Sequence, residues 1–495
     1  MQLVEVTADL NARCLVIYEY LLQAVQACEE AAPPYKNVAT LFFHVLQRYF
    51  SSYLYRTTEL RAQIQGASPI IGESGRFPFW DHSNVLKGLD ADILDYPALP
   101  APNRWGNTGF GTVSGIFSRI NSRPGKQIAL LPTHLNARRL GPRLMLSGHT
   151  LSFPQLDPLG GGALDDQWPI LVRSMEPILE YLCMPREIRA SSLEVLRRYI
   201  AACVTEDETP LHCDALISGS MLTLEHRLMA AQARSQNIPV MVPIHGDADG
   251  FLDEPWSGYG EATYPTHLLS FGRHGDELRR TSQYARGILE AEVPITIPAS
   301  SDVIRRNIWL PERPIRSAGS VKELRLLYIP TAYQLLGSYG PFHSAPDTLY
   351  RQWQKSLLEA FPNITIKEHP TNIENACFVA SGHPTELKPL PNVLDKFDAY
   401  LVDYISTGLN LVAATDKPVI YFDLGIRNPT GRVRMALEAR CIVIKPETLS
   451  PHMLRERVNA HLRDEKVDAY TPEFSITELS DRREDVLVST LKKLL

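Results

Sequence analysis

Hydrophobic residues in the C-terminal third of the chain gather in short runs of strand length, with helical patterns between them. Aliphatic and aromatic residues fill each run, while the intervening segments repeat apolar residues every three or four positions. Strands that alternate with helices are typical of a parallel α/β sheet. The expected strands are 324–329, 363–367, 398–402, 419–422 and 441–444, and the expected helices are 348–360, a segment from 406, 433–438 and 450–462.

The N-terminal part of the chain predicts helices first and a second sheet afterwards. Residues 10–30 and 38–64 have apolar positions on a helical period, which we interpret as core packing, with contact to a membrane or a partner as the alternative. A β-α-β order then follows, as in a parallel sheet. Its expected strands are 127–131, 215–219, 238–242 and 267–271, and its expected helices are 169–205, 223–236 and 276–289, the last closing the sheet.

Length and composition favour a globular enzyme of two domains. A chain of 495 residues exceeds what one hydrophobic core holds, and 44% hydrophobic with 21% charged residues is ordinary for a globular protein. The net charge of -6 argues against nucleic acid as a partner. Seven cysteines without a C-x-x-C pair, no secretory signal pattern and no apolar run of about 18 residues predict a cytoplasmic protein with reduced thiols.

Two polar motifs follow neighbouring expected strands of the C-terminal part. Lys367-Glu368-His369-Pro370 ends the first, and Asp403 and the triplet Ser406-Thr407-Gly408 follow the second. Open α/β sheets bind ligands at the carboxyl ends of their strands. Hydroxyls and backbone N–H groups at a helix start suit a phosphate, and the rigid His-Pro junction fixes the direction of an imidazole. A nucleotide site is the prediction, with a buried histidine and an ordinary helix cap as the alternative.

Acidic residues and glycines gather in one loop after the expected strand 238–242. His245, Asp247 and Asp249 come first, and Tyr259 and Glu261 follow in a glycine-rich stretch. Clustered carboxylates repel one another and glycines cost conformational entropy, so a function is the better explanation of this loop than stability. A solvated loop with an Asx-turn is the alternative. Asp247 and Asp249 also form a D-x-D pair, a weak metal signal, and we expect no metal.

The C-terminal motifs resemble those of bacterial GT-B glycosyltransferases that use CMP- or CDP-linked donors. The shared order is strand and His-Pro, then strand, D-x-x-S-T, helix and the K-P-V-I segment 417–420. Polysialyltransferases, CDP-glycerol glycerophosphotransferases and retaining β-Kdo transferases carry such motifs. The resemblance implies an α/β fold with two Rossmann-like domains that face a cleft and a C-terminal helix that crosses back. The expected domains are an N-terminal acceptor and catalytic domain 1–310, a linker 311–320, a nucleotide-donor domain 321–475 and a crossover helix 476–495.

The resemblance also implies roles for individual residues. The donor nucleotide is expected at His369, Pro370, Lys367, Ser406, Thr407, Thr331 and Asn410. Catalysis is expected from Asp247, Asp249, His245 and His369, with either aspartate acting as general base or as nucleophile. Acceptor contacts are expected from Tyr259, Glu261 and Arg138, although the basic cluster around Arg138 also fits a solvated face. Asn410 replaces the acid that grips a ribose in related GT-B proteins, which leaves the nucleoside contact open.

The implied function is transfer of an acidic sugar, Kdo above all, from a CMP-activated donor to a bacterial O-antigen, lipopolysaccharide or capsule acceptor. Retaining β-Kdo transfer is the primary hypothesis. A CDP-glycerol-type glycerophosphotransferase and a non-catalytic GT-B scaffold are the alternatives, and a GT-B epimerase is disfavoured by Asn410. We expect no cofactor, a glycan or lipid-linked glycan acceptor as partner, and work in the cytoplasm or at the inner face of the plasma membrane.

Overall fold

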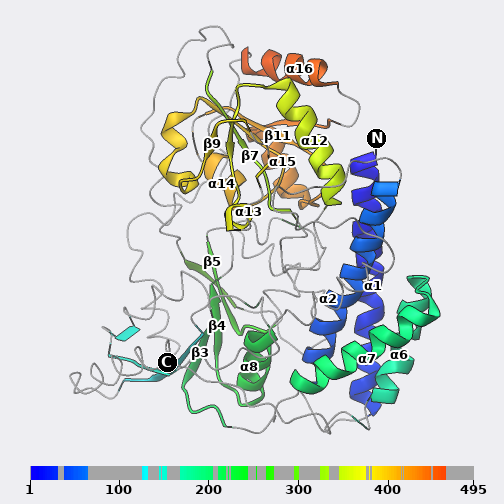
Figure 1. The fold of residues 1–495 in the computed structure, drawn as a ribbon. Helices are drawn as coiled ribbons and strands as arrows, with labels where there is room; N and C mark the ends of the chain where they lie inside the picture. The colour runs from blue at the N-terminus through cyan, green and yellow to red at the C-terminus, as the bar shows by residue number, and fades with distance from the viewer. Residues whose placement is uncertain are drawn as a thin grey trace.

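Two separate parallel sheets organise the chain. The computed structural model describes residues 2–31, 38–64, 125–131, 144–145, 148–152, 165, 168–203, 210–218, 221, 224–243, 252, 264–271, 295–299, 324–333, 345–374, 378–379, 382–413, 415, 417–446 and 450–463. Within these residues every strand pairing in both sheets is parallel. Figure 1 shows the N-terminal sheet in the lower half of the view and the C-terminal sheet in the upper half.

The N-terminal sheet has the strand order β2-β1-β3-β4-β5-β6. Its strands are β1 (Gln127–Leu131), β2 (Thr150–Ser152), β3 (Ala215–Ser218), β4 (Val240–Pro243), β5 (His267–Phe271) and β6 (Ile295–Ala299). The helices described in this half are α6 (Trp168–Tyr181), α7 (Arg186–Cys203) and α8 (Leu224–Ser235). Helix α8 joins β3 to β4, so these three elements form the expected β-α-β unit.

The C-terminal sheet has the strand order β12-β11-β10-β7-β8-β9. Its strands are β7 (Leu326–Ile329), β8 (Thr365–Lys367), β9 (Thr385–Glu386), β10 (Ala399–Val402), β11 (Val419–Phe422) and β12 (Ile442–Ile444). The helical elements are α12 (Asp347–Ala360), α13 (Pro370–Glu374), η6 (Leu390–Asn392), η7 (Leu394–Lys396), α14 (Thr407–Ala413), α15 (Gly431–Arg440) and α16 (Pro451–Arg463).

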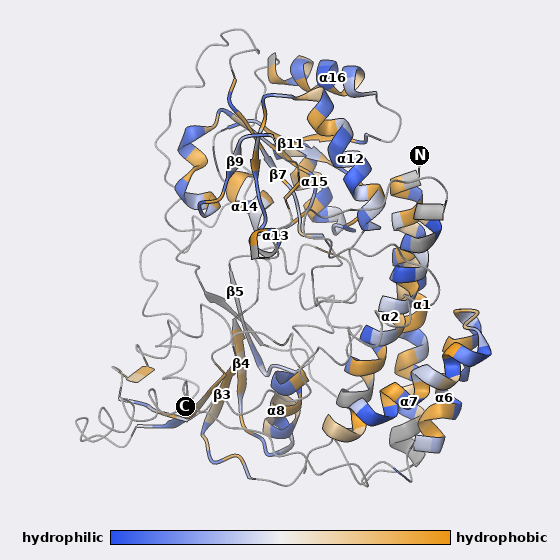
Figure 2. Cartoon of the chain, viewed as in Figure 1, coloured by the Kyte–Doolittle hydropathy of each residue, from blue (hydrophilic) through white to orange (hydrophobic). Residues whose placement is uncertain are grey.

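The central strands of this sheet are buried on both faces. All four residues of β10 and of β11 are buried, because helices cover the sheet on either side. Successive side chains point to opposite faces, so Tyr400 and Val402 join the cluster with α14 and α15, whereas Leu401 joins the cluster with α12 and α16. Figure 2 shows the hydrophobic colour along the strands, while α12 and α16 carry both colours. This two-sided burial explains why the strands read as continuous apolar runs.

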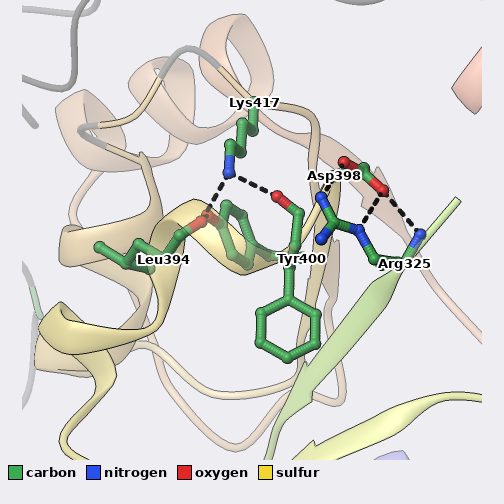
Figure 3. Close-up of polar contacts among 6 residues, drawn as sticks. Arg325, Leu394, Asp398, Tyr400 and Lys417 are labelled. Atoms are coloured by element: carbon green, nitrogen blue, oxygen red, sulfur yellow. Dashed lines mark hydrogen bonds and ion pairs between the residues drawn. The ribbon is translucent and has the colours of Figure 1, made fainter.

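The amino edge of the C-terminal sheet is closed by polar contacts, drawn in Figure 3. The Lys417 ammonium donates to the carbonyls of Leu394, at 2.6 Å, and Phe397, and lies 5.8 Å from the centre of the Tyr400 ring. The Arg325 guanidinium donates two hydrogen bonds to Asp398, at 3.1 and 3.0 Å. Lys417 therefore lies at the edge of the sheet away from the strand exits, and this part of the K-P-V-I segment is structural.

An N-terminal helical hairpin packs against both halves. Helices α1 (Gln2–Ala31) and α2 (Val38–Ile64) contact each other, and α2 also contacts α7, α8 and α12. Figure 1 shows both helices running alongside the two sheets on one side of the molecule. Helix α1 reaches the C-terminal half as well, where the Asn11 side-chain amide donates to the carbonyl of Ile426 at 3.3 Å. The helices predicted at 10–30 and 38–64 are confirmed, and their packing spans both sheets.

The structure differs from the predicted elements in several places, and the short edge strands β2 and β9 are two additions that the sequence did not predict. The expected helix 169–205 is two helices, α6 and α7, because the turn between them places Cys183 in the left-handed region at φ 49°. The N-terminal sheet also continues past β5 to β6, whose Pro298 sits on an edge strand, where a missing N–H is tolerated. The prediction that the sheet closes after 267–271 is therefore wrong.

The expected pair of parallel α/β sheets is confirmed by the strand order. The helix 276–289, the linker 311–320 and the crossover helix 476–495 lie outside the described residues and stay predictions. Among the helices that the structure does describe, none is both long enough and apolar enough to span a bilayer.

Candidate functional site

Three predicted site segments leave adjacent strands at one edge of the C-terminal sheet. Strand β7 lies between β10 and β8, with Val402 paired to Ile329 and Tyr328 paired to Ile366. Because parallel strands end at the same edge, Thr331, His369 and Ser406 all follow the carboxyl ends of this group. In Figure 1, α13 marks this edge on the side of the sheet nearest the N-terminal half.

His369 is half-buried at the start of α13, and its carbonyl accepts the backbone N–H of Ile373 at 3.1 Å. Burial, with a smaller contribution from the charge of Lys367, lowers the pKa of the His369 imidazole to about 4. The ring is therefore neutral at physiological pH. A neutral imidazole offers one N–H donor and one nitrogen acceptor, which suits a hydrogen bond to a phosphate oxygen better than it suits charge neutralisation. The adjacent Pro370 is exposed.

Lys367 and Glu368 are both buried beside this histidine. The Lys367 ammonium donates to the Glu368 carbonyl at 2.8 Å, and burial lowers its pKa against the opposing effect of Glu386 and Glu368. The Glu368 carboxylate accepts the backbone N–H of Val379 at 2.6 Å and the Asn372 side-chain amide at 3.4 Å. Glu368, which the sequence marked only as part of a motif, thus holds the His-Pro turn in place.

Ser406 caps the short helix α14. Its hydroxyl accepts the backbone N–H of Gly408 at 3.2 Å, and its carbonyl accepts that of Asn410 at 3.2 Å. Ser406 and Thr407 are half-buried, and a hydroxyl that accepts one bond still carries a proton it can donate. The predicted helix start is confirmed. Asn410 is buried on α14 rather than exposed at its tip.

Gly408 lets α14 approach the sheet closely. A Cβ at this position would stand 3.2 Å from Cγ2 of Ile329 and 3.4 Å from the Ser406 hydroxyl oxygen. The first of these distances is shorter than most real Cβ contacts, so a side chain here would require the Ile329 side chain or the helix start to shift by a few tenths of an ångström. The absence of a side chain at Gly408 therefore allows the start of α14 to lie close to the end of β7.

A buried carboxylate at the same edge, that of Asp403, accepts hydrogen bonds from three aromatic side chains. Asp403, 1% exposed at the end of β10, accepts hydrogen bonds from the hydroxyls of Tyr328 and Tyr350 and from the Trp353 indole at 3.0 Å. We call these four residues the Asp403 network. Burial raises the pKa of Asp403 to about 6, although the three donors act to lower it. The sequence placed Asp403 in the motif but did not predict this role.

The Asp403 network also reaches the exit segment of β7. The Tyr350 hydroxyl accepts the backbone N–H of Thr331 at 3.1 Å, so one tyrosine serves both Thr331 and Asp403. Gln354 donates to the Tyr328 hydroxyl at 3.4 Å and accepts from the Tyr333 hydroxyl at 2.5 Å. The backbone N–H of Tyr333 in turn donates to Asn372, the partner of Glu368. These bonds join the exits of β7, β8 and β10 into one connected framework.

Two features lie in the segment that follows β11, the neighbour of β10. They are the guanidinium of Arg427 and a contact between Pro429 and Leu252 of the N-terminal half. The Arg427 guanidinium stands 4.6 Å above the ring of Tyr404, two residues before Ser406. Leu252 forms an isolated antiparallel bridge with Pro429 and is fully buried in the core cluster of the C-terminal half. Leu252, which follows Asp249 by three residues in the sequence, is thus a point where the N-terminal half contacts the C-terminal half.

The remaining predicted site residues fall outside the described part of the chain. They are the catalytic candidates His245, Asp247 and Asp249 and the acceptor candidates Tyr259, Glu261 and Arg138. Their roles stay predictions. At the described carboxyl end of β3, the hydroxyl of Ser218 and Nδ1 of His226 are 3.2 Å apart, and both residues are buried. This pair is a core contact rather than an exposed nucleophile and base.

Two solved structures are similar to this chain at low identity. MurG of Acinetobacter baumannii is 10% identical, the match covers 74% of this chain and 99% of that chain, and the TM-score is 0.36. The glycosyltransferase SnogD from Streptomyces nogalater is 13% identical, the match covers 75% and 100%, and the TM-score is 0.34. No protein-family model and no curated protein matches the chain. Superpositions this loose, at identities this low, assign no residue role.

Proposed function

We propose that the protein is a GT-B glycosyltransferase that moves an acidic sugar, Kdo, from a CMP-activated donor to a bacterial O-antigen or capsule acceptor. The observation that carries the proposal is the convergence of Thr331, His369 and Ser406 on three adjacent parallel strands. His369 and Ser406 also belong to the motifs through which the sequence resembles the CMP- and CDP-dependent transferases. Backbone N–H groups, hydroxyls and a neutral imidazole at one sheet edge are suitable ligands for a phosphate.

The donor's own chemistry explains why such a site would suffice. When the bond between the anomeric carbon and the phosphate oxygen breaks, CMP leaves with the electron pair, and the added negative charge falls on the phosphate. Hydrogen bonds aimed at that oxygen stabilise the transition state more than the ground state. A neutral His369 would contribute a donor without a charge, while Lys367 and Arg427 add positive charge near the same edge.

The opposite side of the reaction would come from the N-terminal half. In the retaining reaction, a carboxylate of Asp247 or Asp249 attacks the anomeric carbon as CMP leaves. The acceptor hydroxyl then displaces this carboxylate, and its proton passes to solvent. In an inverting reaction, the same carboxylate instead removes the acceptor's proton as the hydroxyl attacks directly. The bridge between Leu252 and Pro429 supports a site formed by both halves. Leu252 comes three residues after Asp249, and the bridge brings it to the edge of the C-terminal sheet that carries Ser406.

Donor screening tests the proposal. Thermal unfolding is measured for the full chain with CMP-Kdo, CDP-glycerol and CMP alone, and a ligand at 100 times its Kd should add about 2.7 kcal/mol of stability. We expect protection by CMP-Kdo and CMP. Protection by CDP-glycerol instead would move the function to glycerophosphate transfer, and no protection by any cytidine nucleotide would refute the nucleotide site.

Mass spectrometry of the protein after incubation with CMP-Kdo separates the two mechanisms. A covalent sugar on Asp247 or Asp249 is the expected result for retaining transfer, and the variants Asp247→Ala and Asp249→Ala identify which acid carries it. Asp398→Asn, at the opposite edge of the C-terminal sheet, is the matched control and should turn over like the wild type. Full activity of both Ala variants would remove the catalytic assignment of these two acids. Absence of turnover by the wild type with a panel of donors would instead favour a scaffold.

The acceptor and the location are part of the same proposal. A lipid-linked glycan acceptor would bring the enzyme to the inner face of the plasma membrane as a peripheral protein. Sedimentation with vesicles of anionic phospholipid, with and without an added lipid-linked glycan, tests this. Equal amounts of protein in the vesicle pellet and in a vesicle-free control would refute the association.

A further inference from the structure

Helix α12 begins without a cap of its own. Its N-cap residue is Pro346, whose side chain makes no capping hydrogen bond. The first backbone N–H groups of any helix need partners from outside the helix, and a buried start leaves no water to supply them. Asp347 and Thr348, which open α12, are both buried. The partners of these N–H groups therefore have to come from another element.

Helix α2 supplies those partners from almost three hundred residues away in the sequence. The Glu59 carboxylate accepts the backbone N–H of Thr348 at 3.1 Å and also the Thr348 hydroxyl. The Tyr55 hydroxyl accepts the backbone N–H of Asp347 at 3.0 Å and donates to the carbonyl of Ala345 at 3.4 Å. A carboxylate at a helix N-terminus is also favoured by the helix dipole. The start of α12 is thus held by α2.

The other part of α2 is fixed to the N-terminal half. Nη1 of Arg227 on α8 donates to Nδ1 of His44 at 2.6 Å, and both residues are buried. Burial and the charge of Arg227 lower the pKa of His44 well below its usual value, so the imidazole is the neutral acceptor that this bond requires. His44 and Glu59 are about 22 Å apart along the helix, at 1.5 Å for each residue. Helix α2 therefore makes hydrogen bonds to both halves, through His44 at one end and Glu59 at the other.

The same short stretch of α12 holds the candidate nucleotide site. Two residues after Thr348, the Tyr350 hydroxyl accepts the backbone N–H of Thr331 and donates to Asp403. One turn later, the Trp353 indole donates to Asp403 as well. A helix transmits a shift of its first turn to the next turn, because its backbone hydrogen bonds keep the turns in register. The position of Glu59 is therefore linked to Thr331 through a single turn of helix.

We propose that Glu59 and Tyr55 are positioning residues for the candidate nucleotide site, and that α2 and α12 together couple the N-terminal half to the exit segments of β7 and β10. This inference rests on the proposed function only for its ligand. Glu59 touches no substrate, and its effect passes through Thr348 and Tyr350 to Thr331. In an enzyme that binds its donor on one half and its acceptor on the other, such a link makes the donor site sensitive to the position of the opposite half.

The test compares two substitutions on neighbouring residues of α2. Glu59→Gln keeps the shape of the side chain but removes the charge and one acceptor oxygen at the start of α12. Thr58→Ala is the matched control, because the Thr58 hydroxyl is buried and donates at 2.8 Å to the Leu54 carbonyl of its own helix. Tyr55→Phe provides a second test if Glu59→Gln does not fold, since it removes the hydroxyl that serves Asp347 and Ala345.

Two readouts separate positioning from a merely structural role. Hydrogen exchange of the full chain, read on peptides that cover 324–333 and 399–413, should accelerate in Glu59→Gln and Tyr55→Phe and stay at wild-type rates in Thr58→Ala. The Kd for CMP, measured by titration calorimetry, should rise by about threefold to tenfold in the first two variants, as for the loss of an ordinary hydrogen bond. In Thr58→Ala it should stay at the wild-type value.

The outcomes distinguish this inference from the proposed function. If Glu59→Gln melts earlier but exchanges and binds CMP like the wild type, Glu59 is structural and the inference is overturned. If the wild type does not bind CMP at all, the proposed function fails, whereas faster exchange in Glu59→Gln would still support the coupling. If Thr58→Ala accelerates exchange as much as Glu59→Gln does, the effect is general loosening of α2 and the inference is also overturned.

Discussion

Replacing Asp403 by asparagine tests whether this carboxyl is as deeply buried and as firmly held as the structure indicates. The amide keeps the shape of the side chain, its oxygen can accept from the Trp353 indole, and its NH₂ can donate to a tyrosine hydroxyl. The variant should therefore fold. Unlike the carboxyl, it cannot ionise, so it stands in for the protonated form at every pH.

The size of the expected stability difference follows from the pKa of Asp403. Burial raises the pKa of Asp403 from an ordinary 3.8 to about 6, so between these values the folded protein binds more protons than the unfolded chain. Stability from this group is therefore fully present below pH 3.8 and is lost as pH rises to about 6. The difference of about two in pKa corresponds to about 3 kcal/mol. Relative to the wild type, Asp403→Asn should gain about this amount between pH 4 and pH 7.

Urea unfolding at a series of pH values, followed by circular dichroism, measures the difference between variant and wild type. The two proteins are compared by the difference in their free energies of unfolding, because His369 changes stability in the same pH range with the opposite sign. Its contribution is the same in both proteins and cancels in the difference. A difference that stays flat from pH 4 to pH 7 would show that Asp403 keeps an ordinary pKa. A variant that loses stability relative to the wild type as pH rises would show that the three donors outweigh the burial, which contradicts the reasoning.

Three further predictions concern the same half. Gly408→Ala should cost about 1 kcal/mol of stability, because overpacking against Ile329 exceeds the gain in helix propensity, and a rise in Tm would contradict this. The wild type should lose stability as pH falls from about 6.5 to about 4, because in this range the histidine is protonated in the unfolded chain but not in the folded protein. His369→Asn should abolish this loss, which the same urea series measures. Arg325→Ala should cost less than about 1 kcal/mol and leave the Kd for CMP unchanged in calorimetry, since its exposed pair with Asp398 lies at the amino edge; weaker CMP binding would show that this edge also serves the site.

Local pattern predicted most of the C-terminal half, because its central strands β10 and β11 are buried on both faces and read as unbroken apolar runs. The strands at 127–131, 267–271 and 419–422 match the expected bounds, and the other predicted strands begin and end within two residues of theirs. The features that the pattern missed are those that depend on context. Strand β6, which was not predicted, contains Pro298, and its edge position tolerates the missing N–H; the φ of 49° at Cys183 leaves no mark in a helical period.

The residues that leave the strand ends could be predicted from sequence alone: His369 follows β8, and Ser406 precedes a helix that it caps. These follow from contacts a few residues apart, where side-chain type and backbone geometry decide the outcome. Two contacts could be found only in the folded chain: Glu59 caps α12, and Asp403 accepts hydrogen bonds from Tyr328, Tyr350 and Trp353. A carboxylate gains such partners only when packing removes it from water, and its neighbours then come from elements distant in the sequence.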